Sequence, residues 1–254
     1  MKKFLLGTVG LVALGMVSPA SAADLAARPY TKAAPMMVAM YDWSGFYVGA
    51  NAGYGSSRKC YDDAGFVGFP LPVPIHDACG DSTGGLVGGQ IGYNWQAGSW
   101  VFGLEAQGDW ADLSGSVAST LFPATSARAR IDGIGLFTGR VGYAWNNVLL
   151  YVKGGAAVAS DRYNAYVTAT NLDFATGSET RWGGVVGAGL EYGFAPNWSV
   201  GFEYDHMFMG ANNVTLTAPL VIPALYPVEH IGQDVDMATV RVNYRWGGPV
   251  VARY

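Results

Sequence analysis

Eight segments of this chain alternate between apolar residues and small or polar residues, and this alternation constrains the fold more than any other feature. In segment 46–54, Phe46 and Tyr54 share one parity, while Gly49 and Asn51 share the other. A period of two is the pattern of a β-strand whose two faces meet different surroundings. No apolar run after residue 43 is long enough for a membrane-spanning helix. The alternating segments are 46–54, 87–95, 102–110, 137–145, 150–158, 186–194, 199–205 and 238–246.

The connections between these segments alternate between short and long. Short turns are expected at 97–99, 146–147 and 195–197, and long loops at 58–82, 113–129, 161–180 and 211–233. An even strand number, with short turns on one side and long loops on the other, is typical of bacterial outer-membrane barrels. The sequence therefore predicts an all-β fold, an eight-stranded antiparallel up-and-down transmembrane β-barrel over residues 43–246. The turns and both chain ends are expected in the periplasm, and the loops outside.

The composition argues against a soluble barrel with the same number of strands. Charged residues make up 13% of the chain, about half of the roughly 25% found in soluble domains. A lipocalin-like barrel needs a solvated outer face, and this chain has too few charges to supply one. The net charge of -4 gives no reason to expect a nucleic-acid partner.

Aromatic residues gather near the turns and near the loops, which predicts two rings at the membrane surfaces. The ring near the turns and chain ends is expected from Trp43, Trp95, Trp100, Tyr143, Trp145, Tyr192, Trp198, Tyr244 and Trp246, and the ring near the loops from Tyr54, Trp110, Trp182 and Phe208.

The first 22 residues have the organisation of a secretory signal peptide. Lys2 and Lys3 precede an apolar stretch, and Ala20-Ser21-Ala22 forms a small-residue cleavage site. A short tail, 23–42, leads into the barrel, and 247–254 follow it as a C-terminal extension. Export also sets the redox environment of the two cysteines, Cys60 and Cys79. In an oxidising compartment such a pair normally forms a disulfide, and the alternatives are a metal site or two free thiols.

Six charged residues are expected on the inward face, at similar depths on consecutive strands. Each lies about four to seven residues from the nearest turn or strand end, which is on the order of 10–18 Å along the barrel axis. They should form one layer of three acids and three bases near mid-membrane. Such a layer either lines an ion pathway or closes the lumen, and the narrow interior of an eight-stranded barrel favours closure. The six are Glu105, Arg140, Lys153, Glu191, Glu203 and Arg241.

The strand sequences resemble the small outer-membrane proteins of alphaproteobacteria, a group described as porin-family or outer-membrane β-barrel proteins. The resemblance implies an OmpA-like transmembrane barrel without a periplasmic cell-wall domain, inserted into outer-membrane lipid by the barrel-assembly machinery, and some members of the group bind haem. Trp246 or Tyr254 then supplies the terminal aromatic residue that this machinery reads. The matching stretches are Trp43–Gly55, Gly88–Trp95, Leu149–Ala157, Val186–Tyr192 and Thr239–Trp246.

No catalytic constellation stands out in the sequence. His206 and Ser160 lie near the outer interface, but their spacing gives no reason to expect contact, so a non-enzymatic envelope protein, structural or weakly permeable, is the expected function. The alternative is a surface binding protein for haem or a host molecule. Two apolar, Pro-rich loops, the first and the last, each carry one histidine, and His76 and His230 are hypothetical haem ligands there. The plainer interpretation is that the loops pack together and both histidines are solvated.

Overall fold

The computed structural model describes residues 41–217 and 227–246. The expected signal peptide, most of the tail before the barrel, the tip of the last loop and the C-terminal extension therefore lie outside the described residues. Among the described residues, no helix is long and apolar enough to cross a membrane.

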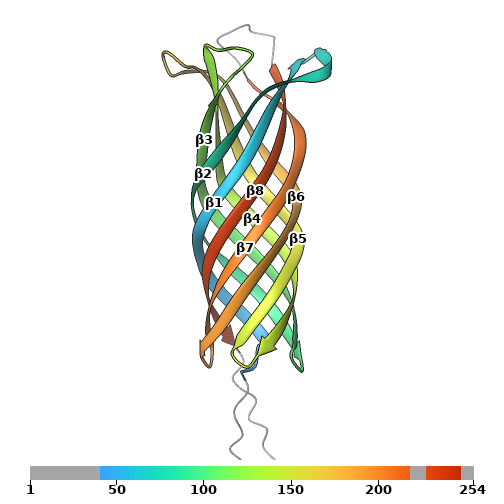
Figure 1. Cartoon of the computed structure of the whole chain (residues 1–254), viewed down its shortest axis with the longest axis vertical. Helices are drawn as coiled ribbons and strands as arrows, with labels where there is room; N and C mark the ends of the chain where they lie inside the picture. Colours follow the sequence, from blue (N-terminus) through green and yellow to red (C-terminus); the bar gives the residue numbers. More distant parts are fainter. Residues whose placement is uncertain (1–40, 218–226, 247–254) are drawn as a thin grey trace, which may run out of the picture. The chain divides into compact units, whose positions relative to one another are not determined.

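Eight antiparallel strands close into one barrel, as predicted, in the order in which they occur along the chain (Figure 1). The strands are β1 (Gly45–Phe66), β2 (Phe69–Ala97), β3 (Trp100–Ala118), β4 (Thr125–Trp145), β5 (Val148–Val167), β6 (Leu172–Ala195), β7 (Trp198–Thr215) and β8 (Pro227–Trp246).

Closure depends on the pairing of the first strand with the last. Strand β1 pairs with β8 from Phe46 opposite Trp246 to Phe66 opposite Pro227. The two-residue turns after β2, β4 and β6 confirm the three predicted short connections. Both ends of the barrel domain, Gly45 and Trp246, therefore lie at the end of the barrel that carries the short turns, called here the short-turn end.

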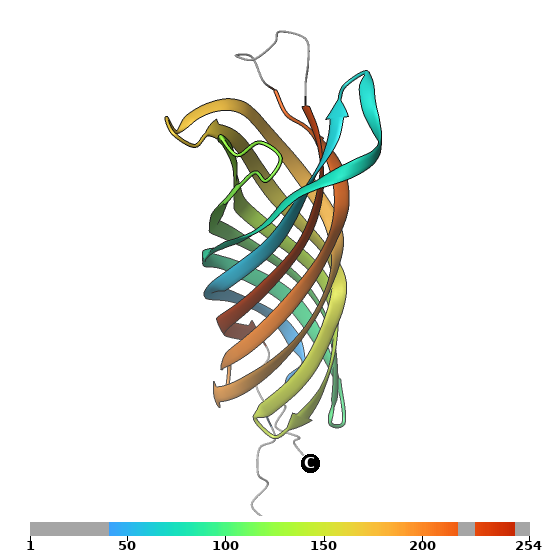
Figure 2. The same cartoon turned by 45° about the horizontal axis from the view of Figure 1, so that its top comes forward.

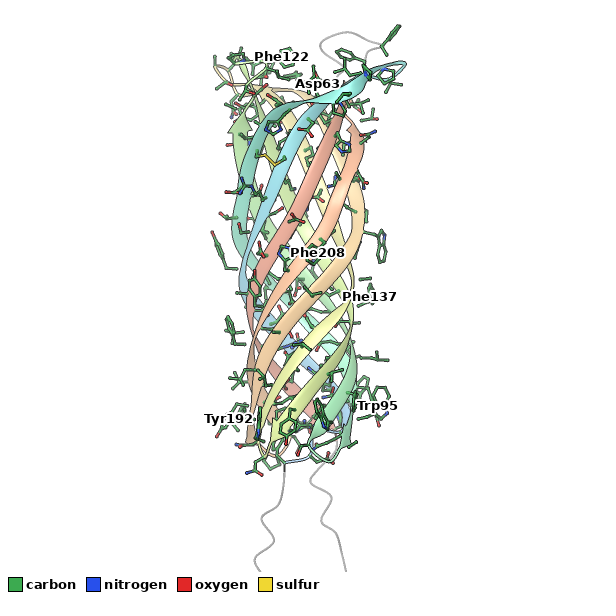
Figure 3. The ribbon with its side chains drawn as sticks, turned by 45° about the vertical axis from the view of Figure 1, so that its right-hand side comes forward. Asp63, Trp95, Phe122, Phe137, Tyr192 and Phe208 are labelled. Carbon is green, nitrogen blue, oxygen red and sulfur yellow. A yellow bond between two sulfur atoms is a disulfide. The ribbon has the colours of Figure 1, made fainter. Side chains whose placement is uncertain are left out.

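The parity of each strand decides which residues enter the lumen. Phe46, Val48 and Tyr54 are exposed on the outer face, while Asn51 is buried inside. Figure 3 shows Trp95 and Tyr192 at the short-turn end and Phe208 further along, all projecting outward. Most of the expected aromatic residues do lie on the outer face.

Trp43 is an exception, and its expected place in the outer ring is wrong. Its side chain is fully buried inside the barrel, and Nε1 donates a hydrogen bond to the carbonyl oxygen of Asn146 at 3.1 Å. The residue precedes β1, where the chain turns inward, so strand parity does not apply to it.

The expected long loops are also wrong, because most of each one continues the strands. The strands are 18 to 29 residues long, whereas about 9–11 residues cross a membrane. Beyond the apolar belt the outward side chains become polar, so the hydrophobic alternation stops while the backbone ladder goes on. Figure 2 shows the β1–β2 hairpin projecting from the end of the barrel opposite to the short turns. We call this the long-loop end.

Candidate functional site

The six charged residues predicted inside the barrel do meet in one buried cluster. Lys153 Nζ lies 2.6 Å from a Glu203 carboxylate oxygen and 3.7 Å from Glu105. Arg241 lies 2.8 Å from Glu105 and also pairs with Glu203. Arg140 bridges Glu105 and Glu191 at 3.6 Å each. Because every side chain is shielded from solvent, we call this cluster the charge layer.

One further carboxylate belongs to the charge layer and was missed in the sequence. Asp205 lies 3.2 Å from Lys153 Nζ and is fully buried. It follows Glu203 by two residues, so the strand period already placed it on the inner face. The layer therefore holds four carboxylates and three cations, in place of the expected three of each.

Two tyrosines anchor the charge layer, and each needs a glycine beside it. Tyr47 donates a hydrogen bond to Glu105 at 2.6 Å, and Tyr151 donates one to Glu203. The Tyr47 ring lies where a Cβ atom on Gly92 would be, and the Tyr151 ring does the same at Gly189. Glycine is therefore required at both inward positions, because each tyrosine ring approaches the backbone too closely for a Cβ atom.

Apolar layers close the lumen on both sides of the charge layer. Toward the short-turn end, Trp43, Val101 and Leu149 pack with Tyr151. Toward the long-loop end lies a larger cluster of buried apolar side chains, comprising Leu86, Ala111, Leu113, Ile131, Ile134, Leu136, Ala157, Ala159, Val185, Met207, Met209, Val235 and Met237. An apolar constriction in a narrow pore resists wetting, so these layers and the charge layer oppose ion flow together.

A second buried ion pair lies beyond this apolar layer. Lys59 Nζ contacts Asp161 at 2.6 Å, with both side chains shielded from solvent, and Lys59 also lies over the Tyr163 ring. Both members of the pair fall in segments that the sequence pattern assigned to loops, so the pattern gave no reason to place them inside the barrel.

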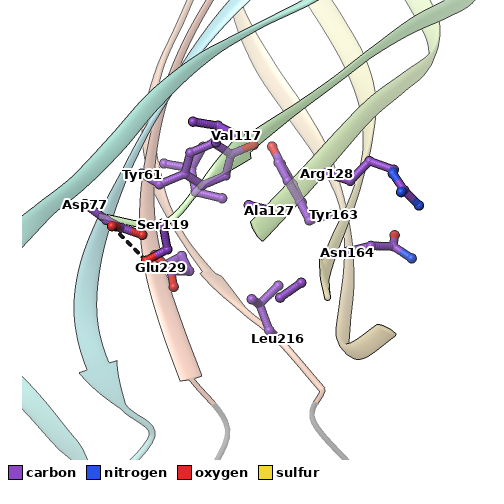
Figure 4. A pocket seen from close by; sticks show the side chains of 12 residues that line it. Tyr61, Asp77, Val117, Ser119, Ala127, Arg128, Tyr163, Asn164, Leu216 and Glu229 are labelled. Atoms are coloured by element: carbon purple, nitrogen blue, oxygen red, sulfur yellow. Dashed lines mark hydrogen bonds between the residues drawn. The ribbon is translucent and has the colours of Figure 1, made fainter. Parts of the chain in front are cut away.

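A small cavity opens at the mouth of the long-loop end (Figure 4). Its volume is about 40 Å³, room for one or two water molecules. Tyr61 and Tyr163 form an apolar floor, and Glu229 and Asp77 lie at one side. Asp77 accepts hydrogen bonds from the Ser119 hydroxyl and from backbone N–H groups, and these bonds lower the pKa of Asp77.

Glu229 is a carboxylic acid of raised pKa at this mouth. Burial, and then the carboxylates of Asp63 and Asp77, raise the pKa of Glu229 from 4.5 to about 8. Asp63 lies directly opposite it on β1. Like charges at directly opposite positions of a sheet repel each other, so protonation of Glu229 near neutral pH relieves this repulsion.

The two histidines considered as haem ligands do not face each other across a cavity. His230 on β8 and His76 on β2 are both register partners of Asp62 on β1, so the three lie in one row on the outer face. His76 Nδ1 lies 2.8 Å from Asp62, and His230 Nδ1 lies 2.8 Å from Asn213. Two strand spacings separate the histidines by roughly 10 Å.

Other side chains considered in the sequence lie apart from these features. His206 on β7 pairs with Asp236 at 2.6 Å, whereas Ser160 lies on β5. Cys60 and Cys79 are direct register partners on β1 and β2 and form the expected disulfide. Within 41–217 and 227–246, no group of three or more His, Cys, Asp or Glu residues could hold a metal ion.

A closed up-and-down barrel with an apolar outer belt and a filled lumen is the architecture of a small outer-membrane protein. Residues 9–246 match the family model described as "Outer membrane protein beta-barrel domain". The chain belongs to this family, and its barrel is embedded in outer-membrane lipid.

The curated relatives are also outer-membrane proteins. The chain is 28% identical to the "31 kDa outer-membrane immunogenic protein" of Brucella melitensis, over 84% of this chain and 90% of that protein. It is 30% identical to the "22 kDa outer membrane protein" of Rhizobium leguminosarum bv. viciae, over 65% and 63% of the two chains. Among solved structures, OprG of Pseudomonas aeruginosa matches with a TM-score of 0.46 and 10% identity, covering 80% of this chain and 97% of that chain.

Proposed function

We propose that the protein is a non-enzymatic envelope component whose barrel is a closed scaffold and whose functional surface is the long-loop end. The observation that carries this proposal is the charge layer. Its cations and carboxylates pair in the absence of solvent, and an apolar layer lies on each side of it. A lumen filled in this way conducts at most small or transient currents.

Planar-bilayer recording on the refolded barrel tests the closed scaffold. We expect no stable channel of high conductance, and we expect liposomes that carry the barrel not to swell in sugars of graded size. A general-diffusion porin reconstituted in parallel is the positive control. Stable high-conductance openings by the wild-type barrel would refute closure.

The proposal includes an orientation, with the short-turn end in the periplasm and the long-loop end outside. It is supported by the signal peptide expected at residues 1–22 and by the start of β1 at the short-turn end. An epitope inserted at the Val67–Gly68 turn should be stained by antibody on intact cells. Staining only after the outer membrane is permeabilised would show that the long-loop end faces the periplasm. N-terminal sequencing of the mature protein should begin at Ala23.

A second candidate function is surface binding of haem or another planar apolar ligand. The row formed by His76, Asp62 and His230 favours it, because a hydrogen bond on Nδ1 is the usual way to orient a histidine that ligates through Nε2. Haemin titration should produce a Soret shift that the combined His76→Ala and His230→Ala substitutions remove. An unchanged band in that variant would eliminate axial ligation by these residues.

A further inference from the structure

The tip of the β1–β2 hairpin, residues 64–75, exposes large apolar side chains far from the membrane belt. Phe69 is 74% exposed, Val73 is 71% exposed, and Phe66, Val67 and Ile75 are also exposed. The tip lies at the extremity of the barrel's long-loop end (Figures 1 and 2). Exposed apolar patches outside a membrane mark interaction surfaces.

The side chains of the tip contain no hydrogen-bonding group. Its sequence is Ala-Gly-Phe-Val-Gly-Phe-Pro-Leu-Pro-Val-Pro-Ile. A binding partner rich in polar groups would lose hydrogen bonds to water on contact with such a surface and regain none. Hydrocarbon has no hydrogen bonds to lose, so it is the partner that fits.

Three prolines also make the free edge of the hairpin unsuitable for pairing with an added β-strand. Phe66 and Phe69 close a two-residue turn, so the Phe69 N–H points toward β1. Pro70, the next residue, points the other way. Residues 71–74 have no register partner on β1, and Pro72 and Pro74 among them likewise offer no N–H to any neighbour. Strand β2 pairs with β3 only from Thr83 inward. Because the outward edge lacks N–H donors at the prolines, it is a poor template for an added strand, and docking must go through side chains.

The acidic residues beside the tip disfavour binding to lipid surfaces with anionic headgroups. Between Cys60 and Cys79 the chain has Asp62, Asp63 and Asp77 but no lysine or arginine. An anionic surface would be repelled by this group, whereas a surface with electrically neutral headgroups would not.

The distance of the tip from the barrel's own bilayer indicates which membrane it meets. Phe66 lies twelve residues beyond Tyr54, a residue of the outer aromatic ring, which corresponds to about 30 Å along the barrel axis. The tip is therefore out of reach of the outer leaflet in which the barrel sits.

We propose that the tip inserts Phe66, Val67 and Phe69 into the hydrocarbon of an apposed bilayer with electrically neutral, phosphatidylcholine-type headgroups. In cells this rests on the proposed outward orientation of the long-loop end. In a nanodisc both ends of the barrel are accessible, so the in vitro test does not depend on that orientation.

The test is flotation of nanodisc-embedded full-length protein with phosphatidylcholine vesicles. The wild type should float with the vesicles, and the combined Phe66→Asp and Phe69→Asp substitutions should reduce the floated fraction at least tenfold. The matched control is Phe122→Asp, which places the same charge at another exposed aromatic residue, in the β3–β4 connection, and should float like the wild type. Heat-modified gel migration verifies that each variant is folded.

Three outcomes overturn insertion of the tip, and a fourth overturns the assigned headgroup. The first is wild-type protein that floats no better than empty nanodiscs. The second is a doubly substituted protein that floats as well as the wild type, which would move the contact elsewhere. The third is association between protein-loaded nanodiscs that requires Phe66 and Phe69 while vesicles are not bound, which would identify a second copy as the partner. Stronger binding to phosphatidylglycerol vesicles than to phosphatidylcholine vesicles would contradict the assigned headgroup.

Discussion

The charge layer shows how a narrow lumen tolerates ionised side chains. Glu105 meets cations from three other strands, namely Arg140, Lys153 and Arg241, so removal of one cation leaves the carboxylate with fewer partners in a medium that solvates it poorly. Removing one partner of a buried ion pair is strongly destabilising, because the other charge is left unpaired. Replacing the whole pair by apolar residues of similar volume is often neutral or stabilising.

Arg241→Met should therefore destabilise the barrel strongly, by about 3–5 kcal/mol, because Glu105 and Glu203 both lose a partner. Denaturant unfolding in lipid vesicles measures the change. The control is Arg162→Met, which removes an exposed guanidinium paired with Asp132 and should cost no more than ~1 kcal/mol. Equal losses in the two variants would mean that burial of the pair is irrelevant.

The glycines of the inner face can be tested one at a time. Gly92→Ala should destabilise by roughly 1–3 kcal/mol, since the new Cβ would overlap the Tyr47 ring. Gly108→Ala, on the outer face of β3, is the control for the substitution itself, because a Cβ there meets nothing within 4 Å. Unfolding midpoints of the two variants should differ, and equal midpoints would show that Tyr47 moves aside freely.

Glu229 should give the long-loop end a pH-dependent stability. Its pKa is raised from 4.5 to about 8 by burial and by Asp63 and Asp77, so the folded state binds a proton that the unfolded chain releases. Stability is then highest below pH 4.5 and falls as the pH rises toward 8. Amide hydrogen exchange in the outer part of β8 should accelerate across this window. Glu229→Gln should flatten the profile, and an unchanged profile in this variant would assign the effect to another group.

At the scale of single elements, each strand is longer than the segment needed to cross the membrane. Hydrophobic alternation reports only where lipid faces the outer surface, whereas the hydrogen-bond ladder needs only a neighbouring strand. Arg130 and Arg162 are outward-facing register partners on β4 and β5, and their polarity marks water at that level. The sequence pattern therefore marked the apolar belt of the outer face and ended each strand too early.

The disulfide should hold the outer part of the β1–β2 hairpin. Cys60 and Cys79 are separated by 19 residues, a cross-link worth about 3 kcal/mol in the chain-entropy description. The combined Cys60→Ala and Cys79→Ala substitutions should let chymotrypsin cut after Phe66, since the Phe69–Pro70 bond resists this enzyme, while the rest of the barrel stays protected. Unchanged cleavage kinetics would show that the strand ladder alone is sufficient there.

At the scale of the whole molecule, the two halves of the barrel repeat one arrangement. In the first half Tyr47 lies over Gly92 and binds Glu105, and in the second half Tyr151 lies over Gly189 and binds Glu203. The two sets lie four strands apart on opposite sides of the lumen. Arg241 contacts both carboxylates, so one cation joins the halves at the centre of the seal.

Assembly of the whole barrel depends on its last strand. Trp246 ends β8 opposite Phe46 of β1, which makes it the better placed of the two candidate terminal aromatics. Deletion of 247–254 should leave the yield of assembled, heat-modifiable barrel unchanged, and Trp246→Ala should lower it. Loss of assembly on deletion alone would assign the signal to Tyr254 instead.

The amino-acid sequence alone determined the number of strands, their inner and outer faces, the three short turns and the six residues at the depth of the charge layer. Each of these follows from local periodicity, because lipid outside and a packed lumen inside impose opposite demands on neighbouring residues.

Only the tertiary structure decided which charges pair, that Asp205 joins them, that Trp43 turns inward and that His76 and His230 flank Asp62. The tertiary structure also showed that the strands continue into the segments expected to be loops. These features depend on strand register and barrel closure, which bring together residues far apart in the chain, and no local pattern encodes those distances.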